Sequence, residues 1–375
     1  MRPRWRPLAP CLGLLWLWAP LLGGSSGAGQ IGIYHWGGQY SNSVQQGVDA
    51  IAALGGHVAR LALSASYYRD YNIAPNCHPA FTLVSAAQEN DISRALANPA
   101  IDVFIITAYD GVTWGDCLTP KFIDPAFFTP AHTAEIVQEY SDFTSYLYRA
   151  YDHTNKQFII SNWESDNSVY CGQAYSYATN PEFRSICRSQ YTSLGAPSPD
   201  AAIEGMKLWL KARAEGVPDG RLRAQAEGLR DVQVYHGPEF NIVHALHDSG
   251  LPSLLYDVLP FVAFDYVSYS AWESINTADP AGTLLADLET IENVLGTGAI
   301  IIGEVGFQRK LRSGHDVSQT SQVITAALRW GAPYIIQWEL YDADSGNLFG
   351  LYDFEGRPTP LGDWFRGRFR LGALE

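Results

Sequence analysis

The 375-residue sequence lacks the short motifs that mark metal-dependent and phosphate-binding enzymes. It contains no His-Glu-x-x-His, no Cys-x-x-Cys and no Gly-x-x-x-x-Gly-Lys-Ser/Thr, and its nine histidines are scattered along the chain. Zinc sites and phosphate-binding loops need such ligands at such spacings. We therefore predict neither a metal site nor a cofactor.

Positive charge is also scarce. With 25 lysines and arginines against 39 aspartates and glutamates, the formal net charge is −14. A chain of this balance repels polyanions such as nucleic acids and acidic polysaccharides, unless a local basic groove overrides the average. The charge therefore favours a neutral or cationic ligand, and we predict no nucleic-acid partner.

Long apolar runs are confined to the N-terminus. Arginines at positions 2, 4 and 6 precede an apolar run from Leu8 to Leu22 and a small-residue segment from Gly23 to Gly29. This is the pattern of a secretory signal peptide, and we predict that residues 1–28 are removed, leaving one domain over residues 29–375. The run is short for a membrane span and no second one follows. We expect an extracellular or periplasmic protein that does not stay in the membrane.

Four cysteines remain after the predicted cleavage: Cys77, Cys117, Cys171 and Cys187. An even number in an exported protein predicts two disulfides, and three pairings can be drawn. The order along the chain favours Cys77–Cys117 and Cys171–Cys187, because each pair would then staple one long loop region.

Strand-like and helix-like segments alternate from residue 31 onward. One helical stripe, Val44–Leu54, ends at Gly55, and another, Leu284–Leu295, ends at Gly296. Eight strands that alternate with helices predict a parallel (β/α)8 barrel, the TIM-barrel fold. Further helical patterns cover Ala202–Glu215, Ile242–Val258 and Val323–Trp330. The predicted strands are Ile31–Trp36, Val58–Ser64, Ile101–Ala108, Phe158–Trp163, Val232–His236, Phe261–Tyr269, Ala299–Val305 and Tyr334–Leu340.

Three connections, Tyr67–Phe81, Asp110–Pro130 and Ser165–Pro199, are long and carry the cysteines. All three follow the carboxyl ends of predicted strands, which is where barrel enzymes build their clefts. Aromatic residues make up 13% of the chain and include 11 tryptophans, a surplus that suits stacking on flat ligands such as sugar rings. We therefore expect a binding cleft on this face.

Two glutamates stand at the ends of predicted strands. Glu164 ends the fourth strand, and Glu304 ends the seventh, within the apolar segment Ile300–Phe307. Because the carboxyl ends of barrel strands form the active face, these two side chains are expected to meet across its mouth. Such a pair suits hydrolysis of a glycosidic bond, in which one carboxyl group protonates the leaving oxygen and the other attacks the anomeric carbon.

Several segments around these glutamates resemble one group of enzymes, the retaining glycoside hydrolases whose catalytic glutamates end strands four and seven of a (β/α)8 barrel. The resemblance covers most of the barrel and includes enzymes of the cellulase, mannanase and β-galactosidase type. It implies a carbohydrate substrate, Glu164 as acid/base and Glu304 as nucleophile. The matching segments are Val58–Leu63, Asn162–Glu164, Gly303–Gly306, Gln337–Trp338 and Phe349–Pro360.

The resemblance also implies supporting residues around the cleft. Arg60 looks like the second-strand arginine that contacts the nucleophile, Tyr269 like a sixth-strand tyrosine that hydrogen-bonds it, and Trp338 like the tryptophan under the cleaved sugar. The residues alone leave alternatives open for each: a structural ion pair for Arg60, a buried tyrosine with a satisfied hydroxyl for Tyr269, and a packed tryptophan for Trp338. Trp36 and His236 lie at other strand ends, where each is a substrate-binding candidate or a core residue.

The fourth strand departs from the pattern of these enzymes. They place asparagine directly before the acid/base glutamate, whereas Trp163 here stands between Asn162 and Glu164. In a regular strand, Asn162 and Glu164 would then point to the same side. If the strand bulges, Asp166 is the substitute candidate. Glu339, on the eighth strand, is expected to face away from the cleft and to play no catalytic part.

The sequence therefore predicts an exported, retaining glycoside hydrolase with a TIM-barrel fold and long, disulfide-stapled loops. Two other interpretations stay open. One is a barrel that binds glycans without turning them over, and the other is a barrel hydrolase or lyase of different chemistry.

Overall fold

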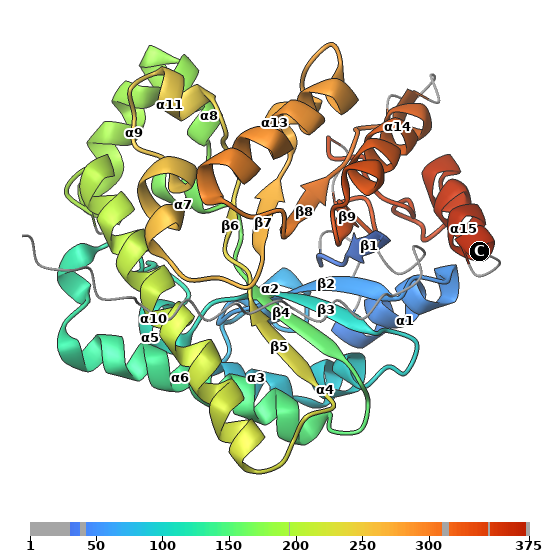
Figure 1. Cartoon of the computed structure of the whole chain (residues 1–375), viewed down its shortest axis with the longest axis horizontal. Coiled ribbons are helices and arrows are strands. Elements are labelled where there is room, and N and C mark those ends of the chain that lie inside the picture. The colour runs from blue at the N-terminus through green and yellow to red at the C-terminus, as the bar shows by residue number, and fades with distance from the viewer. Residues whose placement is uncertain (1–30, 38–42, 195, 310–314, 344–345, 373–375) are drawn as a thin grey trace, which may run out of the picture.

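Nine parallel strand segments form one curled sheet at the centre of the protein, and helices surround it (Figure 1). The computed structural model describes residues 31–37, 43–194, 196–309, 315–343 and 346–372, so the predicted signal peptide lies outside the described residues. The strands are β1 Ile31–Tyr34, β2 Val58–Leu63, β3 Val103–Ala108, β4 Gln157–Ser161, β5 Gln233–His236, β6 Glu239–Phe240, β7 Val267–Ser270, β8 Ile300–Val305 and β9 Ile335–Gln337.

Helices connect most of the strands and lie on the outside of the sheet (Figure 1). Among the described residues, none of the helices is long and apolar enough to span a membrane. They are α1 Val44–Leu54, α2 Tyr67–Asp70, α3 Leu83–Gln88, α4 Asn90–Leu96, α5 Gly111–Trp114, η2 Pro125–Phe127, α6 Pro130–Ala150, α7 Ser165–Val169, α8 Ala174–Thr179, α9 Pro181–Leu194, α10 Pro199–Ala226, α11 Ala245–Asp248, η3 Leu254–Val258, η4 Leu259–Phe261, α12 Trp272–Ile275, α13 Pro280–Leu295, α14 His315–Trp330 and α15 Pro360–Gly372.

The sheet closes into a barrel because β5 and β6 are two parts of one strand. The sheet order runs β5-β4-β3-β2-β1-β9-β8-β7-β6, so β5 and β6 are its two ends. In the chain only Gly237 and Pro238 separate them. Gly237 N–H donates to Ile160 at 2.9 Å, and Pro238 accepts from Ser268 N–H at 2.9 Å, so both neighbouring ladders continue across the gap. The nine segments occupy eight barrel positions, and the predicted (β/α)8 fold is confirmed.

Two apolar layers hold the barrel together. One layer fills the barrel interior, and the other lies between the strands and the helices. Ile301 of β8 belongs to the interior layer, whereas its neighbours Ile300 and Ile302 belong to the outer one. Because strands such as β2, β3 and β8 are buried on both faces, they read as largely apolar runs. The interior layer comprises Tyr34, Val58, Val103, Ile105, Ile159, Ile301, Tyr334 and Ile336.

Most predicted elements are present, but the region between β6 and β7 differs. The predicted helix Ile242–Val258 is wrong, because only α11 and the single turn η3 form there, with Gly250 in a left-handed conformation at φ 66° and Pro252 between them. The first half of the predicted strand Phe261–Tyr269 is also wrong. Phe261 ends the turn η4 and is 60% exposed, and β7 begins only at Val267.

Both predicted disulfides are confirmed. Cys77 pairs with Cys117 and Cys171 with Cys187, with Cα–Cα distances of 6.2 and 5.9 Å. Each bond joins parts of the long connections that follow β2, β3 and β4. The loops on the carboxyl side of the barrel are therefore covalently tied.

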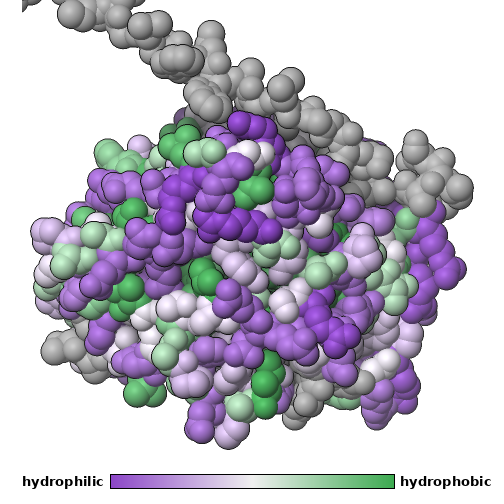
Figure 2. Space-filling model, turned by 90° about the horizontal axis from the view of Figure 1, so that it is seen from below, coloured by the Kyte–Doolittle hydropathy of each residue, from purple (hydrophilic) through white to green (hydrophobic). Residues whose placement is uncertain are grey.

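The outer surface contrasts with this apolar interior. The face in Figure 2 is mostly hydrophilic, and its apolar residues lie in small separate groups. Many of the aromatic side chains are instead buried or line a cavity at the carboxyl ends of the strands. That cavity is the candidate functional site.

Candidate active site

A cavity of about 1280 Å³ opens at the carboxyl ends of the barrel strands. Its walls include residues that lie one or two positions beyond the ends of four strands, namely Trp36, Ser64, Trp163 and Trp272. Glu164 and Glu304 lie at its floor, 3% and 2% exposed. The aromatic residues of the wall are Tyr34, Trp36, Tyr109, Trp114, Phe122, Trp163, Tyr175, Trp272, Trp338 and Phe349.

Glu164 lies at a sharp turn rather than in a strand. The strand β4 ends at Ser161, and Glu164 adopts φ 24° and ψ 73°, a backbone conformation that costs roughly 1–3 kcal/mol for a residue other than glycine. The turn is held because Glu164 N–H donates to Glu239 Oε1 at 3.2 Å and its carbonyl accepts from Ser168 N–H at 3.0 Å. It aims the carboxyl group into the cavity, where the Asn167 amide donates to Oε2.

Glu304 faces the cavity because β8 contains a β-bulge. Tyr269 of β7 pairs with Ile302, but the next residue of β7, Ser270, pairs with Glu304, and the pairing with β9 slips in the same way. One extra residue on β8 reverses the alternation of side chains. Glu304 therefore points inward, and Trp272 Nε1–H donates to its Oε2 at 3.1 Å.

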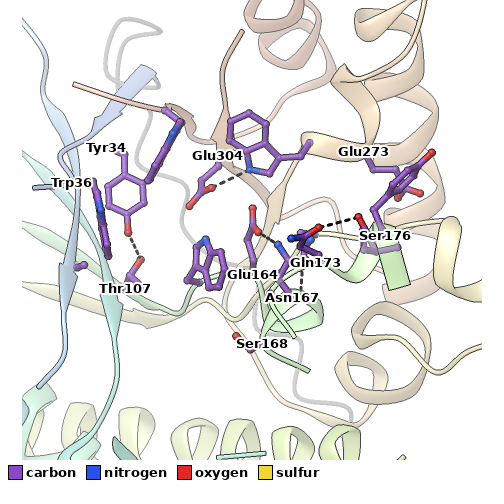
Figure 3. Close-up of a pocket in the computed structure, with 18 of the residues that line it drawn as sticks. Tyr34, Trp36, Thr107, Glu164, Asn167, Ser168, Gln173, Ser176, Glu273 and Glu304 are labelled. Atoms are coloured by element: carbon purple, nitrogen blue, oxygen red, sulfur yellow. Dashed lines mark hydrogen bonds between the residues drawn. The ribbon is translucent and has the colours of Figure 1, made fainter. Parts of the chain in front are cut away.

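The two carboxyl groups point toward one another in the middle of the cavity (Figure 3). Burial raises the pKa of Glu164 well above its ordinary value, and the negative charges of Glu304 and Glu239 act in the same direction. Burial also raises the pKa of Glu304, to about 7, but the Arg60 charge and a hydrogen bond with Glu164 oppose that rise. Of the pair, Glu164 holds its proton more tightly and Glu304 ionises first.

Arg60, the expected partner of Glu304, forms its closest ion pair with Glu239. Arg60 Nη1 lies 2.6 Å from Glu239 Oε2 and Nη2 lies 2.8 Å from Oε1, whereas Nη2 is 3.6 Å from Glu304 Oε1. The guanidinium is fully buried in the barrel interior, over the ring of Tyr34 at 4.5 Å. Arg60 thus lies beneath the cavity floor, where it acts on the charge of Glu304 rather than as a wall residue.

Three predicted site residues face away from the cavity because of strand alternation. Asn162 turns toward α10, where Arg213 Nη1 donates to its Oδ1 at 2.9 Å. Tyr269 lies on the outer face of β7, with its hydroxyl 2.8 Å from Ser274 Oγ. His236 lies on the outer face of β5, and its Nδ1 is 2.9 Å from the Ala263 carbonyl. None of the three lines the cavity within the described part of the chain.

Two predicted aromatic residues do line the cavity. Trp36 and Trp338 lie with ring centroids 6.4 Å apart, and Tyr34 packs edge-on against Trp338 at 4.9 Å. These rings belong to adjacent strand positions, because β1 pairs with β9. They form an apolar wall beside the two carboxyl groups, and a flat ligand ring could pack against it.

The two other carboxylates considered from the sequence do not line the cavity in the described part of the chain. Asp166 is fully buried and accepts backbone N–H groups of Leu254 at 2.9 Å, Asn241 at 3.1 Å and Ile242 at 3.2 Å, which ties α7 to β6 and η3. Glu339 is fully buried outside the cavity wall, as expected for its strand position. Glu164 therefore remains the acid/base candidate.

Sequence reasoning missed three residues of this site. Glu239 lies beyond the predicted end of the fifth strand, after Gly237 and Pro238, and Trp272 lies beyond β7. Asn167, on α7, accepts Ala174 N–H at 2.8 Å through its Oδ1, which orients its amide nitrogen toward Glu164. In the sequence, these three residues are marked only by their positions shortly after strand ends, which is weak evidence for a place in the site.

One cluster of the described residues could hold a metal ion, and it lies away from the cavity. Asp152, His153 and Asp231 bring their ligand atoms together at the opposite ends of the strands, beside β4 and β5. Exposed acidic groups of this kind are common without an ion. The cluster is not connected with the glutamate pair.

Comparison with known proteins establishes the fold. No family model and no curated protein matches the sequence. A GH5_18 from Bifidobacterium longum subsp. infantis superposes with a TM-score of 0.55 at 13% identity, over 91% of this chain and 78% of that one. A GH5_18 from Streptomyces cattleya, solved in complex with GlcNAc, gives a TM-score of 0.54 at 13% identity, over 92% and 80%. A beta-glucosidase 1317 gives 0.55 at 13%, over 88% and 87%.

The solved structures that resemble this chain thus include glycosidases. At such low identity the likeness shows the shared barrel alone. The chain is a (β/α)8-barrel protein whose cavity holds a buried glutamate pair at the ends of its fourth and seventh barrel strands.

Proposed function

We propose that this protein is a retaining glycoside hydrolase, with Glu304 as the nucleophile and Glu164 as the acid/base. One observation carries the proposal: two buried carboxyl groups, both with raised pKa values, face each other in a cavity walled by aromatic rings. The sugar-processing names of the structural neighbours agree with it. The remaining support comes from the fit between these groups and the chemistry of glycosidic bonds.

In the first step, Glu304 attacks the anomeric carbon and Glu164 gives its proton to the glycosidic oxygen. The carbon–oxygen bond to the leaving group breaks, and an ester between the sugar and Glu304 forms. In the second step, Glu164 takes a proton from water, the water oxygen bonds to the anomeric carbon, and Glu304 leaves. Asn167 N–H stabilises the carboxylate that Glu164 becomes after the first step.

We assign retention rather than inversion because the two carboxyl groups lie close together. They face each other in one cavity, and the charge of Glu304 raises the pKa of Glu164; retaining enzymes hold such a pair roughly 5–5.5 Å apart. An inverting enzyme needs its carboxyl groups roughly 6.5–9.5 Å apart, because a water molecule must fit between one of them and the sugar. A direct attack by Glu304 needs no such gap.

The cavity favours a saccharide leaving group and hence an oligo- or polysaccharide substrate. Its volume of about 1280 Å³ exceeds the range of roughly 300–1,000 Å³ typical of pockets for one drug-sized ligand. Figure 3 shows Tyr34 and Trp36 on one side of the carboxyl pair, and Gln173, Ser176 and Glu273 on the other. The second side lies next to the acid Glu164, where the leaving group departs, and its amide, hydroxyl and carboxylate groups match sugar hydroxyls.

We expect Tyr175→Ala to impair oligosaccharides selectively. Tyr175 lies on α8 in the cavity wall, next to Ser176 in the chain, and is 55% exposed and thus available for stacking. Its loss should lower kcat/KM for an oligosaccharide about 10-fold, since aromatic packing contributes about 0.5–1.5 kcal/mol beyond burial. An aryl monoglycoside, whose leaving group is no sugar, should be affected less than about 2-fold. The matched control is Phe261→Ala, an exposed aromatic residue outside the cavity. Equal losses on both substrates would contradict the assignment.

The pH dependence of kcat/KM follows from the two glutamates. The active form has Glu304 ionised and Glu164 protonated. As the pH falls through the raised pKa of Glu304, about 7, the nucleophile gains a proton and the rate falls. As the pH rises through the still higher pKa of Glu164, the acid is lost and the rate falls again. We expect a bell-shaped profile with an optimum above neutral pH. A profile that stays flat down to pH 5 in buffered initial-rate assays would oppose this account.

Digestion of a glycan panel tests the proposed function directly. Wild-type protein should release shorter products from at least one neutral or cationic oligosaccharide, and product sizing then separates internal from terminal cleavage. Binding without turnover across oligosaccharides and aryl glycosides would instead identify a glycan-binding barrel. The two disulfides fit the oxidising compartments outside the cytosol, and we propose that the protein is exported to its substrate.

A further inference from the structure

A third carboxyl group, that of Glu239 on β6, lies beneath the glutamate pair. It is fully buried below the cavity floor, and both of its oxygens are engaged. Oε1 accepts from Arg60 Nη2 at 2.8 Å and from the backbone N–H of Glu164 at 3.2 Å. Oε2 accepts from Arg60 Nη1 at 2.6 Å and from Ser268 Oγ at 2.7 Å. Glu239 is thus in direct contact with the acid/base candidate and with the cation that faces the nucleophile.

The contact with Glu164 is made at its strained turn. The N–H that Glu239 accepts belongs to the residue with φ 24°, a conformation that persists only where neighbours fix it. Glu239 is itself fixed to this region, because the Asn162 side chain bridges its backbone. Asn162 Oδ1 accepts Glu239 N–H at 3.1 Å, and Asn162 Nδ2 donates to its carbonyl at 3.0 Å. This explains why Asn162 faces away from the cavity.

The contact with Glu304 runs through Arg60. The single positive charge of Arg60 lies 2.6–2.8 Å from the oxygens of Glu239 but 3.6 Å from Glu304. Arg60 Nη1 also donates to the carbonyl of Gly303, directly before the nucleophile, at 2.8 Å. A Cβ at Gly303 would meet Glu239 Oε2 at 2.0 Å, so the glycine makes room for this ion pair.

We propose that Glu239 is a positioning residue that holds Glu164 at its turn and keeps Arg60 from forming a full ion pair with Glu304. Without the Glu239 charge, Glu304 would be the nearest carboxylate to the Arg60 guanidinium. A full ion pair with Arg60 would then make Glu304 a weaker nucleophile. The inference rests on the proposed glycosidase reaction, because it assigns Glu239 a part in preparing both reacting groups.

Other titratable groups on the elements packed around this cluster do not change charge near neutral pH. Burial raises the pKa of Tyr34 far above its ordinary value and that of Tyr109 to about 12, so both hydroxyls stay protonated. Burial lowers the pKa of His236, on β5, to about 3, which keeps it neutral. Arg213, on α10, lies on the far side of Asn162. The pH response of the site therefore reports on Glu164 and Glu304, and Arg60 stays charged throughout because the pKa of its guanidinium is raised.

The test is the pH profile of Glu239→Gln, which removes the charge and keeps the shape. Because the Glu239 charge raises the pKa of both Glu164 and Glu304, its loss should move both limbs of the kcat/KM profile to lower pH, by about one pH unit. We expect kcat to fall about 10-fold or more, with KM changed less, since ground-state sugar contacts remain. Glu239→Asp keeps the charge and should leave the limbs near their wild-type positions while lowering kcat, because the shorter side chain cannot reach both Arg60 and the Glu164 N–H.

The matched control is Glu139→Gln. Glu139 on α6 also accepts backbone N–H groups, from Leu83 and Gly111 at 2.9 Å, but lies away from the cavity. It should lower thermal stability without moving the pH limbs. The inference is overturned if Glu239→Gln turns over substrate and both limbs of its kcat/KM profile stay at the wild-type pH. If Glu239→Gln does not fold, a wild-type kcat in Glu239→Asp overturns it instead. Absence of turnover in the wild type would instead refute the proposed function.

Discussion

Replacing Glu304 by glutamine is expected to lower kcat at least about 10³-fold on every substrate of the wild type. The amide cannot form the sugar ester, so the first step loses its nucleophile whatever the leaving group. Binding should persist, because the aromatic wall of Trp36 and Trp338 and the groups beside Glu164 remain. Initial rates and calorimetric titration of an oligosaccharide measure the two effects separately.

The control for this prediction is again Glu139→Gln, which removes a carboxylate elsewhere in the fold and should retain wild-type kcat per folded molecule.

The Glu304→Gln variant should also be at least as stable as the wild type at neutral pH. Its folded-state pKa is raised from 4.5 to about 7. Ionisation of Glu304 therefore costs stability as the pH rises from about 4.5 through 7, and a neutral glutamine avoids that cost. Loss of activity that simply tracks unfolding would count against a chemical role.

Glu164→Gln is expected to have an effect that depends on the leaving group. For an oligosaccharide, whose leaving oxygen needs a proton, kcat/KM should fall about 10²–10⁴-fold, the usual contribution of a general acid. For an aryl glycoside with an acidic phenol as leaving group, the first step needs no proton and kcat/KM should fall far less. The second step still lacks its base, so the sugar ester on Glu304 should accumulate and appear as a burst of released phenol.

Azide tests whether the second step lacks only the base that Glu164 supplies. In Glu164→Ala, which removes the side chain, a small anion that needs no base should enter the vacated space, restore turnover of the aryl glycoside, and give a glycosyl azide of retained configuration. Mass spectrometry of the product identifies it. If kcat/KM falls equally for both classes of substrate and azide does not restore turnover, Glu164 is not the acid/base. The insertion of Trp163 between Asn162 and Glu164 would then mark a different arrangement from that of the similar enzymes.

The sequence predicts the barrel because its signals are local. The apolar runs of the strands and the glycines at 55 and 296 that end α1 and α13 reflect short-range constraints. The predicted helix Ile242–Val258 fails for a related reason. Its apolar spacing fits a helix, but Gly250 and Pro252 interrupt it, and Asp166 fixes the backbone there from another element.

The site is less predictable because two departures from regular strands create it. Regular alternation would turn Glu304 outward, and the bulge in β8 turns it inward. Regular alternation would likewise place Glu164 with Asn162, but the left-handed turn separates them, with Asn162 toward α10 and Glu164 in the cavity. Tyr269 follows the regular rule and so misses the cavity. The turn at Glu164 depends on a distant partner, because Glu239 accepts its N–H.

The stereochemistry of the first-formed product tests the central claim most directly. Proton NMR during the first minutes of hydrolysis, before mutarotation, distinguishes the two anomers of the released sugar. Double displacement through Glu304 predicts that the product first appears with the anomeric configuration of the substrate. A product that first appears with the opposite configuration would contradict the covalent step on Glu304.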